Sequence, residues 1–312
     1  MYRPAISFSA VLISLCLAGG INKVFCQAVM QSITSKVGLI IQSDSDTCIS
    51  VLKSDGKQLV LRQVAKPEER PYIHPIYSPD GQTVITEFRP GHHIHQTGLF
   101  WGLKRVNGRD YFMNGRGDYW KRKSLQVIKG SGKQVSWQTV YNLLDSTGHA
   151  IMEEEQNWTI EQIDNRYILD FKWTGKASVN VHIGKFYVGG LFVRMPWRKG
   201  TPAEAINASG LVDKQAEGQR SEWFDVGIQF KDPSNRIHFA ILDHSSNKAF
   251  PTPWRIDGEF GFGPSRQIME DWEIAGGQTE TIRYRAIIYA GELDKDLIQK
   301  ESLKYQTSFK PR

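Results

Sequence analysis

Hydrophobic and polar residues alternate along most of this chain. In the segment 167–173 the odd-numbered positions are large and apolar, while Asp170 and Lys172 are polar. The same period of two recurs at 135–141 and 282–288. Such a period places every second side chain on one face of the backbone, so each run predicts a β-strand with one buried face.

Turn sequences separate the strand-like runs, as at Asp55-Gly56 and Asn107-Gly108. Only 293–305 has the pattern of a helix, and no helix alternates with the strands. We therefore predict an all-β protein, a large antiparallel β-sandwich with a short C-terminal helix. Long loops are predicted at 189–202 and 207–222. Other predicted strands are 37–42, 48–52, 58–63, 83–88, 100–106, 124–129, 178–188, 225–230 and 236–242.

The first residues have the layout of a signal peptide. Arg3 precedes a short apolar stretch at 6–18, and small residues follow at 18–20 and at Ala28. A spanning helix needs about 20 apolar residues, so this stretch is too short for one. We predict a signal peptide at 1–28, a single β-sandwich domain at 29–312 without a transmembrane segment, and a periplasmic or extracellular location.

Charge and cysteine content narrow the function. The formal net charge is +6, but Lys and Arg are interleaved with acidic residues, so nucleic acid is not an expected partner. Cys48 is the one cysteine beyond the predicted leader and cannot form an internal disulfide. Nine tryptophans are present, and in an exported protein such rings stack on sugars as well as filling a core.

Four of the eight histidines fall in one short stretch, at His74, His92, His93 and His95. In an extended segment His93 and His95 point to the same face. This spacing suits an acid and a base that titrate near neutral pH. It also suits a divalent metal if a third ligand comes from elsewhere in the chain. A hydrogen-bonded cluster that fixes a turn is the structural alternative.

Two other constellations are candidates for substrate contact. Glu217 precedes Arg220 by three residues on a predicted loop, which offers a carboxylate for proton transfer and a guanidinium for a substrate oxygen. A surface ion pair explains this spacing equally well.

The other constellation pairs Asp243-His244 with Trp254-Arg255 across a proline-rich segment. It can form a polar wall with a stacking ring, or merely a rigid loop. In addition, Arg194 follows the paired glycines 189–190, which suggest either a β-bulge or the close approach of a ligand to the backbone.

Taken together, these segments resemble a known bacterial family, once labelled methane oxygenase PmoA-like and now treated as a domain of unknown function. The resemblance covers about 58–300. A methane oxygenase subunit would need membrane spans, which the sequence lacks. The resemblance implies a sugar-related role, by association with carbohydrate-degrading systems. Many members have a second histidine and an arginine where Gln96 and Thr97 stand here. The matching blocks are 72–76 (YIHPI), 93–102 (HIHQTGLFWG), 106–108 (VNG), 189–197 (GGLFVRMPW), 217–220 (EGQR), 243–244 (DH), 251–255 (PTPWR) and 261–264 (GFGP).

The resulting hypothesis is a carbohydrate-active enzyme that cleaves or modifies a glycoside by hydrolysis or β-elimination. No cofactor is expected. The alternatives are a non-catalytic glycan-binding module and a metal-dependent enzyme that uses His93 and His95. The predicted catalytic residues are His93, His95, Glu217 and His74. The predicted substrate-binding residues are Arg194, Arg220, Asp243, His244, Trp254, Arg255 and Trp101.

Overall fold

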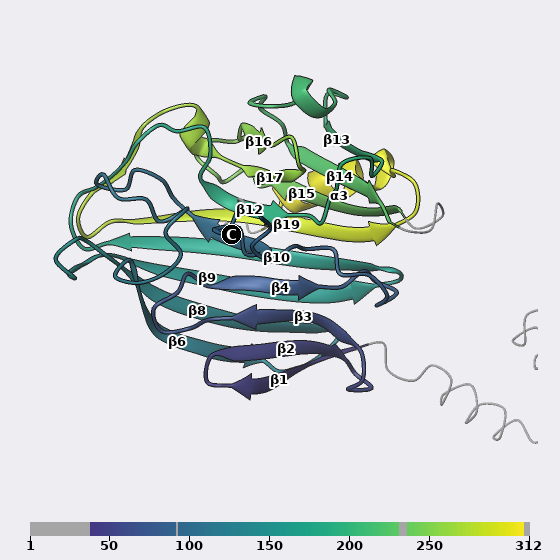
Figure 1. Cartoon of the computed structure of the whole chain (residues 1–312), viewed down its shortest axis with the longest axis horizontal. Helices are drawn as coiled ribbons and strands as arrows, with labels where there is room; N and C mark the ends of the chain where they lie inside the picture. The colour runs from purple at the N-terminus through teal and green to yellow at the C-terminus, as the bar shows by residue number, and fades with distance from the viewer. Residues whose placement is uncertain (1–37, 92, 231–235, 309–312) are drawn as a thin grey trace, which may run out of the picture. The chain divides into compact units, whose positions relative to one another are not determined.

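The computed structural model describes residues 38–91, 93–230 and 236–308 (Figure 1). The predicted signal peptide at 1–28 lies outside these residues. Strands dominate, and nearly all of them belong to two large antiparallel sheets. The predicted all-β sandwich is therefore confirmed.

The larger sheet has nine strands within the described residues, in the order β16-β17-β12-β5-β4-β3-β2-β1-β7. Neighbouring strands in it pair antiparallel. Its strands are β1 (Leu39–Ser45), β2 (Cys48–Lys53), β3 (Leu59–Val64), β4 (Tyr72–Ile76), β5 (Leu99–Gly102), β7 (Ser131–Gly132), β12 (Gly190–Arg194), β16 (Trp254–Ile256) and β17 (Gly261–Pro264).

The second sheet has eight strands in the described part of the chain, in the order β13-β14-β15-β19-β10-β9-β8-β6. These are β6 (Trp120–Lys129), β8 (Gln134–Leu144), β9 (Ala150–Ile163), β10 (Arg166–Ala177), β13 (Ala203–Asn207), β14 (Trp223–Gln229), β15 (Arg236–Asp243) and β19 (Thr279–Ala290). A two-stranded sheet joins β11 (Val181–Ile183) to β18 (Trp272–Ile274), and short 3-10 helices lie at Asp213–Gln215 and Arg266–Ile268.

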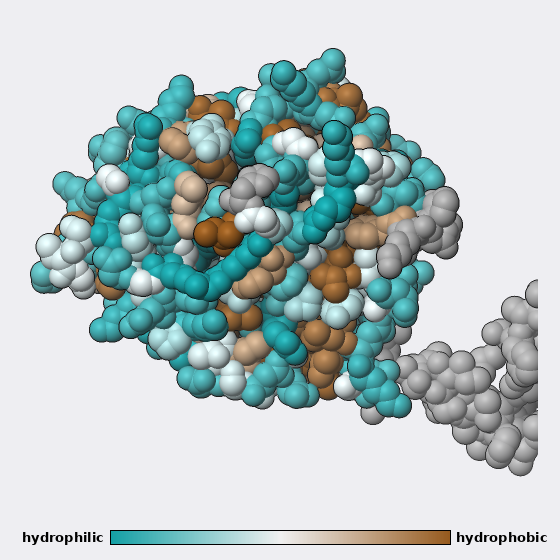
Figure 2. All heavy atoms as spheres, viewed as in Figure 1, coloured by the Kyte–Doolittle hydropathy of each residue, from teal (hydrophilic) through white to brown (hydrophobic). Residues whose placement is uncertain are grey.

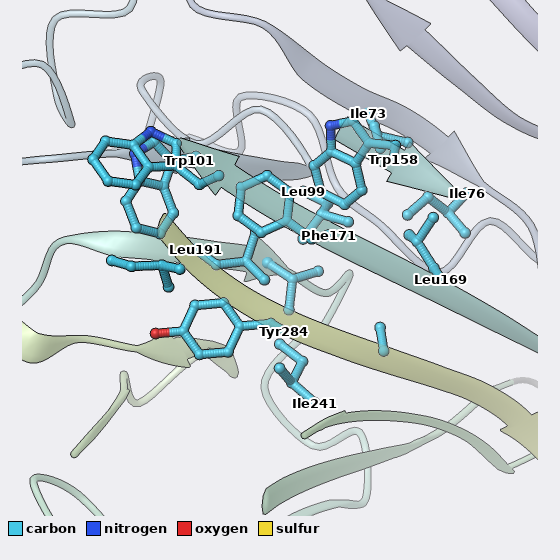
Figure 3. Close-up of a cluster of buried hydrophobic side chains, with 14 of the residues drawn as sticks. Ile73, Ile76, Leu99, Trp101, Trp158, Leu169, Phe171, Leu191, Ile241 and Tyr284 are labelled. Carbon is cyan, nitrogen blue, oxygen red and sulfur yellow. The ribbon is translucent and has the colours of Figure 1, made fainter. Parts of the chain in front are cut away.

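The main core lies between the two large sheets (Figure 3). Alternate residues of the nine-stranded sheet, such as Ile73, Leu99 and Leu191, contribute to it from one side. Phe171 and Tyr284 belong to the eight-stranded sheet and contribute from the other side. Burial of such side chains is the main favourable term in folding, at about 25 cal/mol per Å² of apolar surface.

Helix α3 (Lys295–Gln306) covers the opposite face of the eight-stranded sheet. It begins after Asp294, whose side chain accepts a hydrogen bond from the backbone N–H of Leu297 at 2.9 Å. Its residues Ile298 and Tyr305 are buried against this sheet in a second apolar cluster. The helix predicted at 293–305 is therefore confirmed.

Two predicted strands differ from the structure at positions where a side chain forms hydrogen bonds with backbone groups. The segment 83–88 forms only isolated bridges, because Oγ1 of Thr86 accepts the backbone N–H of Ile76 at 3.1 Å. Strand β5 ends at Gly102 rather than at 106. Beyond it, the side chain of Gln267 bonds both the N–H and the carbonyl of Lys104, at 2.9 and 2.8 Å.

The segment 189–202, predicted as a loop, contains the central strand β12. The segment 178–188, predicted as a strand, forms a strand only at β11. Gly190 has φ of 117°, and a Cβ there would lie 2.8 Å from the carbonyl oxygen of Pro264. Glycine is therefore required for β12 to pass this close to β17. Among the described residues, no helix is long and apolar enough to cross a membrane.

Candidate functional site

The candidate site lies on the face of the nine-stranded sheet that points away from the main core. Because side chains alternate along a strand, the neighbours of core residues Ile73, Leu99 and Leu191 point to this other face. There Phe100 and Phe192 form a small aromatic cluster with residues of the loops that cover the sheet. The full cluster is Tyr72, Phe100, Phe112, Val188 and Phe192.

A tight loop carries His93 and His95 over this aromatic cluster. The backbone N–H of Gln96 donates to the carbonyl of His93 at 2.9 Å. Arg70 holds the loop from below, since its Nη2 donates to the carbonyl of His95 at 2.6 Å. The same guanidinium lies 3.7 Å above the ring centroid of Phe100. Both histidines are therefore fixed to the sheet through backbone atoms, which leaves their rings for other contacts.

The rings of His93 and His95 lie side by side, with centroids 5.8 Å apart and planes at 71°. The ring of His95 also packs against Phe112, at 6.0 Å between centroids. Burial, together with nearby positive charges such as those of Arg70 and Lys104, lowers the pKa of His95 to about 4. At neutral pH this imidazole is therefore neutral and has one nitrogen lone pair that can accept a proton.

His74 has a different environment from the other two histidines. It points to the same face from β4, and its Nδ1 lies 3.0 Å from Oγ1 of Thr86. Its ring stacks on Phe88 at 5.4 Å, and burial lowers its pKa. It lines neither cavity that contains His95. The structure thus brings His93 and His95 together and places His74 where it supports the loop.

Three adjoining cavities run across this face. The central cavity, of about 100 Å³, contains both His93 and His95. It shares His95 and Met113 with a cavity of about 410 Å³, here called the arginine cavity. On its other side it shares Arg255 and Asp257 with an outer cavity of about 430 Å³. The central cavity is lined by His93, His95, Gln96, Lys104, Phe112, Met113, Tyr187, Val188, Phe192, Arg255 and Asp257.

Glu217 and Arg255 meet at the boundary of the central and outer cavities. Nη1 of Arg255 donates to one carboxylate oxygen of Glu217, and the backbone N–H of Ile256 donates to the other at 2.5 Å. Arg220, predicted to bind substrate, instead donates to the carbonyls of Ala249 and Phe250 at 3.0 and 3.3 Å. The structure therefore places Arg255 in the site and uses Arg220 to hold a loop.

Arg194 is predicted to contact substrate, but its side chain is only 1% exposed. Its guanidinium lies among three carboxylates, all from segments that border the site. Such an arginine holds these segments in place, because its hydrogen-bonding capacity is directed to them. The carboxylates are those of Glu87, with Oε2 3.7 Å from Nε, of Asp257, with Oδ2 3.3 Å from Nη1, and of Glu259, which contacts Nη2.

Asp243 and His244 form a buried structural connection. Asp243 accepts hydrogen bonds from the backbone N–H groups of His244 and Thr252, at 2.9 and 2.7 Å, and from the Asn247 side chain at 2.7 Å. The ring of His244 contacts Ser246 and the carbonyl of Ser308, beyond helix α3. Neither residue lines any of the three cavities. Because both side chains are buried, they do not make the predicted substrate contacts.

Trp101 and Trp254 are core residues. Trp101 is 1% exposed and stacks on Trp173, with ring centroids 4.8 Å apart (Figure 3). Trp254 is 0% exposed and stacks on Phe224. Stacking on a sugar needs an exposed ring face, and neither indole offers one. Their burial therefore does not fit the predicted role in substrate binding.

The exposed ring at the site belongs instead to Tyr187, which is 57% exposed and lines the central cavity. Ile94 and Met113 are also exposed and line the arginine cavity. Figure 2 shows that the face in view is mostly hydrophilic, with separate hydrophobic patches between the polar side chains. A polar groove with apolar side chains at its edge suits a ligand that is polar but has apolar ring faces.

Sequence reasoning also missed two cationic residues. Lys104 lines the central cavity, where its Nζ pairs with Asp110 at 2.6 Å. Arg70 lies in the adjoining arginine cavity. The one signal for Arg70 was its position two residues before the matching block at 72–76. Lys104 gave no signal, because an isolated lysine after a strand is ordinarily at the surface.

The donor set offers little support for a metal ion. Within the described ranges, which omit residue 92, no group of three or more His, Cys, Asp or Glu side chains is arranged to hold one. His93 and His95 would need a third ligand.

Known proteins with related structures include a GH36 α-galactosidase, AgaB, from Geobacillus stearothermophilus. It is 10% identical, with a TM-score of 0.42, and the match covers 80% of this chain but only 41% of the galactosidase. A galactose mutarotase related enzyme from Lactobacillus acidophilus is 8% identical, with a TM-score of 0.31, and is matched over 82% of this chain and 100% of its own.

Sequence comparison gives a firmer assignment. None of the curated proteins matches this sequence significantly. The model of a family of unknown function, DUF6807, matches residues 50–302, which is most of the chain. The protein therefore belongs to the DUF6807 family.

Proposed function

We propose that this protein is a carbohydrate-active enzyme that cleaves a glycoside in the central cavity, with His95 as the proton acceptor. One observation carries the proposal. The central cavity combines a neutral imidazole with the cations Lys104 and Arg255 and with the exposed ring of Tyr187. These are the groups needed to remove a proton, to stabilise the resulting negative charge and to hold a sugar ring.

The positive charges around His95 support a reaction that develops negative charge on the substrate. Arg70 and Lys104 contribute to the low pKa of His95 because they disfavour a second positive charge. An enolate formed in the same place would be stabilised by these cations. Its negative charge would also make His95 a stronger base as the proton moves.

This arrangement favours β-elimination over hydrolysis. Most glycoside hydrolases need two carboxyl groups that flank the scissile bond. The central cavity contains one carboxylate, Asp257, while Glu217 lines the outer cavity and is bound to Arg255. Elimination requires a base and a stabilised oxyanion, which His95, Lys104 and Arg255 provide.

The proposed step acts on a glycoside that has a ketone at carbon 3 of the ring. Carbon 2 then lies between this ketone and the anomeric carbon. His95 removes the proton from that intervening carbon, and the C–H electrons form an enolate. When the ketone re-forms, the bond from the anomeric carbon to the glycosidic oxygen breaks, which leaves an unsaturated keto-sugar. His93, whose Nδ1 lies 3.4 Å from Oε2 of Glu259, gives a proton to the departing oxygen.

Two further features of the sequence support this assignment. The predicted signal peptide would deliver the protein to the periplasm or the exterior, where polysaccharides are met. The resemblance to the PmoA-like family implies a sugar-related role. Export from the cytoplasm, a sugar-related role and carbohydrate as the ligand are therefore parts of this proposal.

The test compares matched glycosides that carry either a hydroxyl or a ketone at carbon 3. We expect wild-type protein to release the alcohol from the keto-glycoside and to exchange the carbon-2 proton in deuterated water. His95→Gln should lose about 10²–10⁴-fold in rate. His149→Gln, at an exposed turn outside the cavities, is the matched control and should keep full activity.

The contrary outcomes are distinct. Binding of these glycosides without turnover or exchange would identify a glycan-binding module. Unchanged turnover in His95→Gln would remove His95 from the chemistry. Cleavage of the hydroxyl form without carbon-2 exchange would indicate hydrolysis.

A further inference from the structure

The arginine cavity carries more positive than negative charge. Among the described residues, its lining includes Arg70, Arg89 and Arg116 but only one carboxylate, that of Glu69. The cavity is about 410 Å³, and it opens from the central cavity at His95. A second sugar residue that continues from a ring held at His95 would therefore lie among these three guanidinium groups.

Glu69 does not neutralise these charges, because several cations share it. Nε of Arg116 lies 3.2 Å from its Oε1, while Nη2 of Arg89 lies 3.9 Å from its Oε2. Nζ of Lys66 lies 3.4 Å from the same Oε2. One carboxylate thus orders three basic side chains, and a net positive charge remains at the cavity wall.

The charge of Arg70 adds to this excess. Its Nη1 and Nη2 donate to backbone carbonyls, including those of Phe112 and His95, and not to a carboxylate. Two carboxylates act on this charge: Glu154, whose pKa burial raises to about 7, and Asp110, which is itself paired with Lys104 at 2.6 Å. A buried guanidinium bound to neutral oxygens retains its positive field.

Arg89 has a donor with no partner in the structure. Its Nε is buried and makes no hydrogen bond to any described residue. A buried N–H without an acceptor costs about 1–3 kcal/mol, so the described residues do not use the full hydrogen-bonding capacity of this guanidinium. The guanidinium is planar and can bind a carboxylate or sulfate through two N–H groups.

We propose that the arginine cavity binds an anionic substituent of the glycan, a carboxylate or a sulfate ester, through Arg89 and Arg116. This inference rests on the proposed function, since it names the substrate class of the same groove. The exposed side chains of Ile94 and Met113 line the cavity and would contact the C–H face of the same sugar. The favoured substrate is thus an acidic or sulfated glycan rather than a neutral one.

The test measures binding of matched disaccharides by calorimetry. Each set has one sugar configuration and differs only at carbon 6 of one ring, which carries a hydroxyl, a carboxylate or a sulfate. Glucose, galactose and mannose sets are used. We expect an anionic member to bind at least tenfold more tightly than its neutral counterpart, and the preference to shrink as salt rises from 50 to 500 mM, because salt screens exposed charges. Comparison of the carboxylate and sulfate members distinguishes the two groups.

Variants locate the effect. Arg89→Gln and Arg116→Gln should each weaken binding of the anionic disaccharide about tenfold, as expected for loss of a charge-assisted hydrogen bond, and leave binding of the neutral one unchanged. Arg166→Gln is the charge-matched control, since Arg166 pairs with Asp164 at a turn of the other sheet. It should alter neither affinity.

The outcomes separate this inference from the proposed function. Equal binding of neutral and anionic disaccharides would overturn the anionic subsite and leave the glycan-processing role intact. If Arg89→Gln and Arg116→Gln both retain the preference for the anionic disaccharide, the anionic group binds elsewhere and the proposed subsite in the arginine cavity is overturned. Absence of binding by every set would overturn the anionic subsite, whereas the proposed function is judged separately by the keto-glycoside assay.

Discussion

Nδ1 of His93 lies 3.4 Å from Oε2 of Glu259, and the same oxygen contacts Nη2 of Arg194. Glu259 thus connects the histidine loop to a buried arginine of β12. Arg194 in turn faces Glu87, which lies in the segment 83–88 predicted as a strand, and Asp257 of the central cavity. The position of the proposed proton donor therefore depends on the charge cluster around the buried Arg194.

Replacement of Arg194 by methionine should destabilise the fold. Arg194→Met leaves three carboxylates without their shared cation, two of them largely buried. Loss of one partner from a buried ion pair costs about 3–5 kcal/mol of unfolding free energy. Urea denaturation monitored by tryptophan fluorescence measures this change.

The control is Arg198→Met, at an exposed residue that also pairs with Glu87. An exposed pair contributes about 0–1 kcal/mol, so this variant should remain close to wild type. Similar small losses in both variants would show that the carboxylates around Arg194 tolerate its absence.

The titration of His95 gives a second prediction. Its pKa is lowered to about 4 from the usual 6.5 by burial and by nearby cations. NMR of the imidazole carbon-bound protons should show a midpoint near pH 4 for this ring, assigned by its absence in His95→Gln. A midpoint near 6.5 would contradict the positive environment on which the proposed mechanism depends.

The same shift has a consequence for stability. Because the folded pKa lies below the unfolded one, the unfolded chain binds the proton more readily between these values. The stabilising effect of neutral His95 is complete above pH 6.5 and is lost as pH falls through 4. Wild type should therefore lose more stability than His95→Gln over this range. The stability of wild type must be compared with that of His95→Gln at each pH. Burial raises the pKa of Glu154 to about 7, so its contribution to stability changes with pH in the opposite direction in both proteins.

The sequence predicted the sandwich because one face of most strands meets the core and the other meets water. It failed at β12, where all five residues are buried and no alternation is visible. There a second layer of loops packs on the outer face of the sheet. Gly190, in the segment predicted as a loop, instead allows a central strand to pass close to β17, and Gly189 leaves room for the side chain of Gln267.

The same limit explains the mixed outcome for the site. His93 and His95 were recognised because they are close in sequence, and a turn brings their rings together although the segment is not extended as predicted. For Trp101 and Trp254, the type of residue suggested sugar stacking, but the parity of each strand decides burial. That parity is fixed by long-range pairing, such as Trp254 opposite Pro264, which no local pattern contains.

Metal dependence gives a third prediction. Because His93 and His95 lack a third ligand in the described part of the chain, activity should survive chelation. Protein made without a histidine tag is dialysed against EDTA, then assayed and analysed for metals. This expectation is contradicted if EDTA abolishes turnover, one equivalent of a divalent ion restores it, and His93→Ala prevents that restoration.

The aromatic residues give the last prediction. Tyr187→Ala removes an exposed ring at the central cavity, so glycan affinity should fall about tenfold while the unfolding free energy changes by less than about 0.5 kcal/mol. Trp254→Ala removes a fully buried indole that donates to the carbonyl of Ser221 at 2.9 Å, so it should cost about 3–5 kcal/mol of stability. Calorimetry and urea denaturation of both variants separate the two effects. If Tyr187→Ala binds glycans as wild type does, the ring that holds the sugar lies elsewhere in the groove. Near-normal stability in Trp254→Ala would instead mean that the core around Phe224 can close over the space left by the indole.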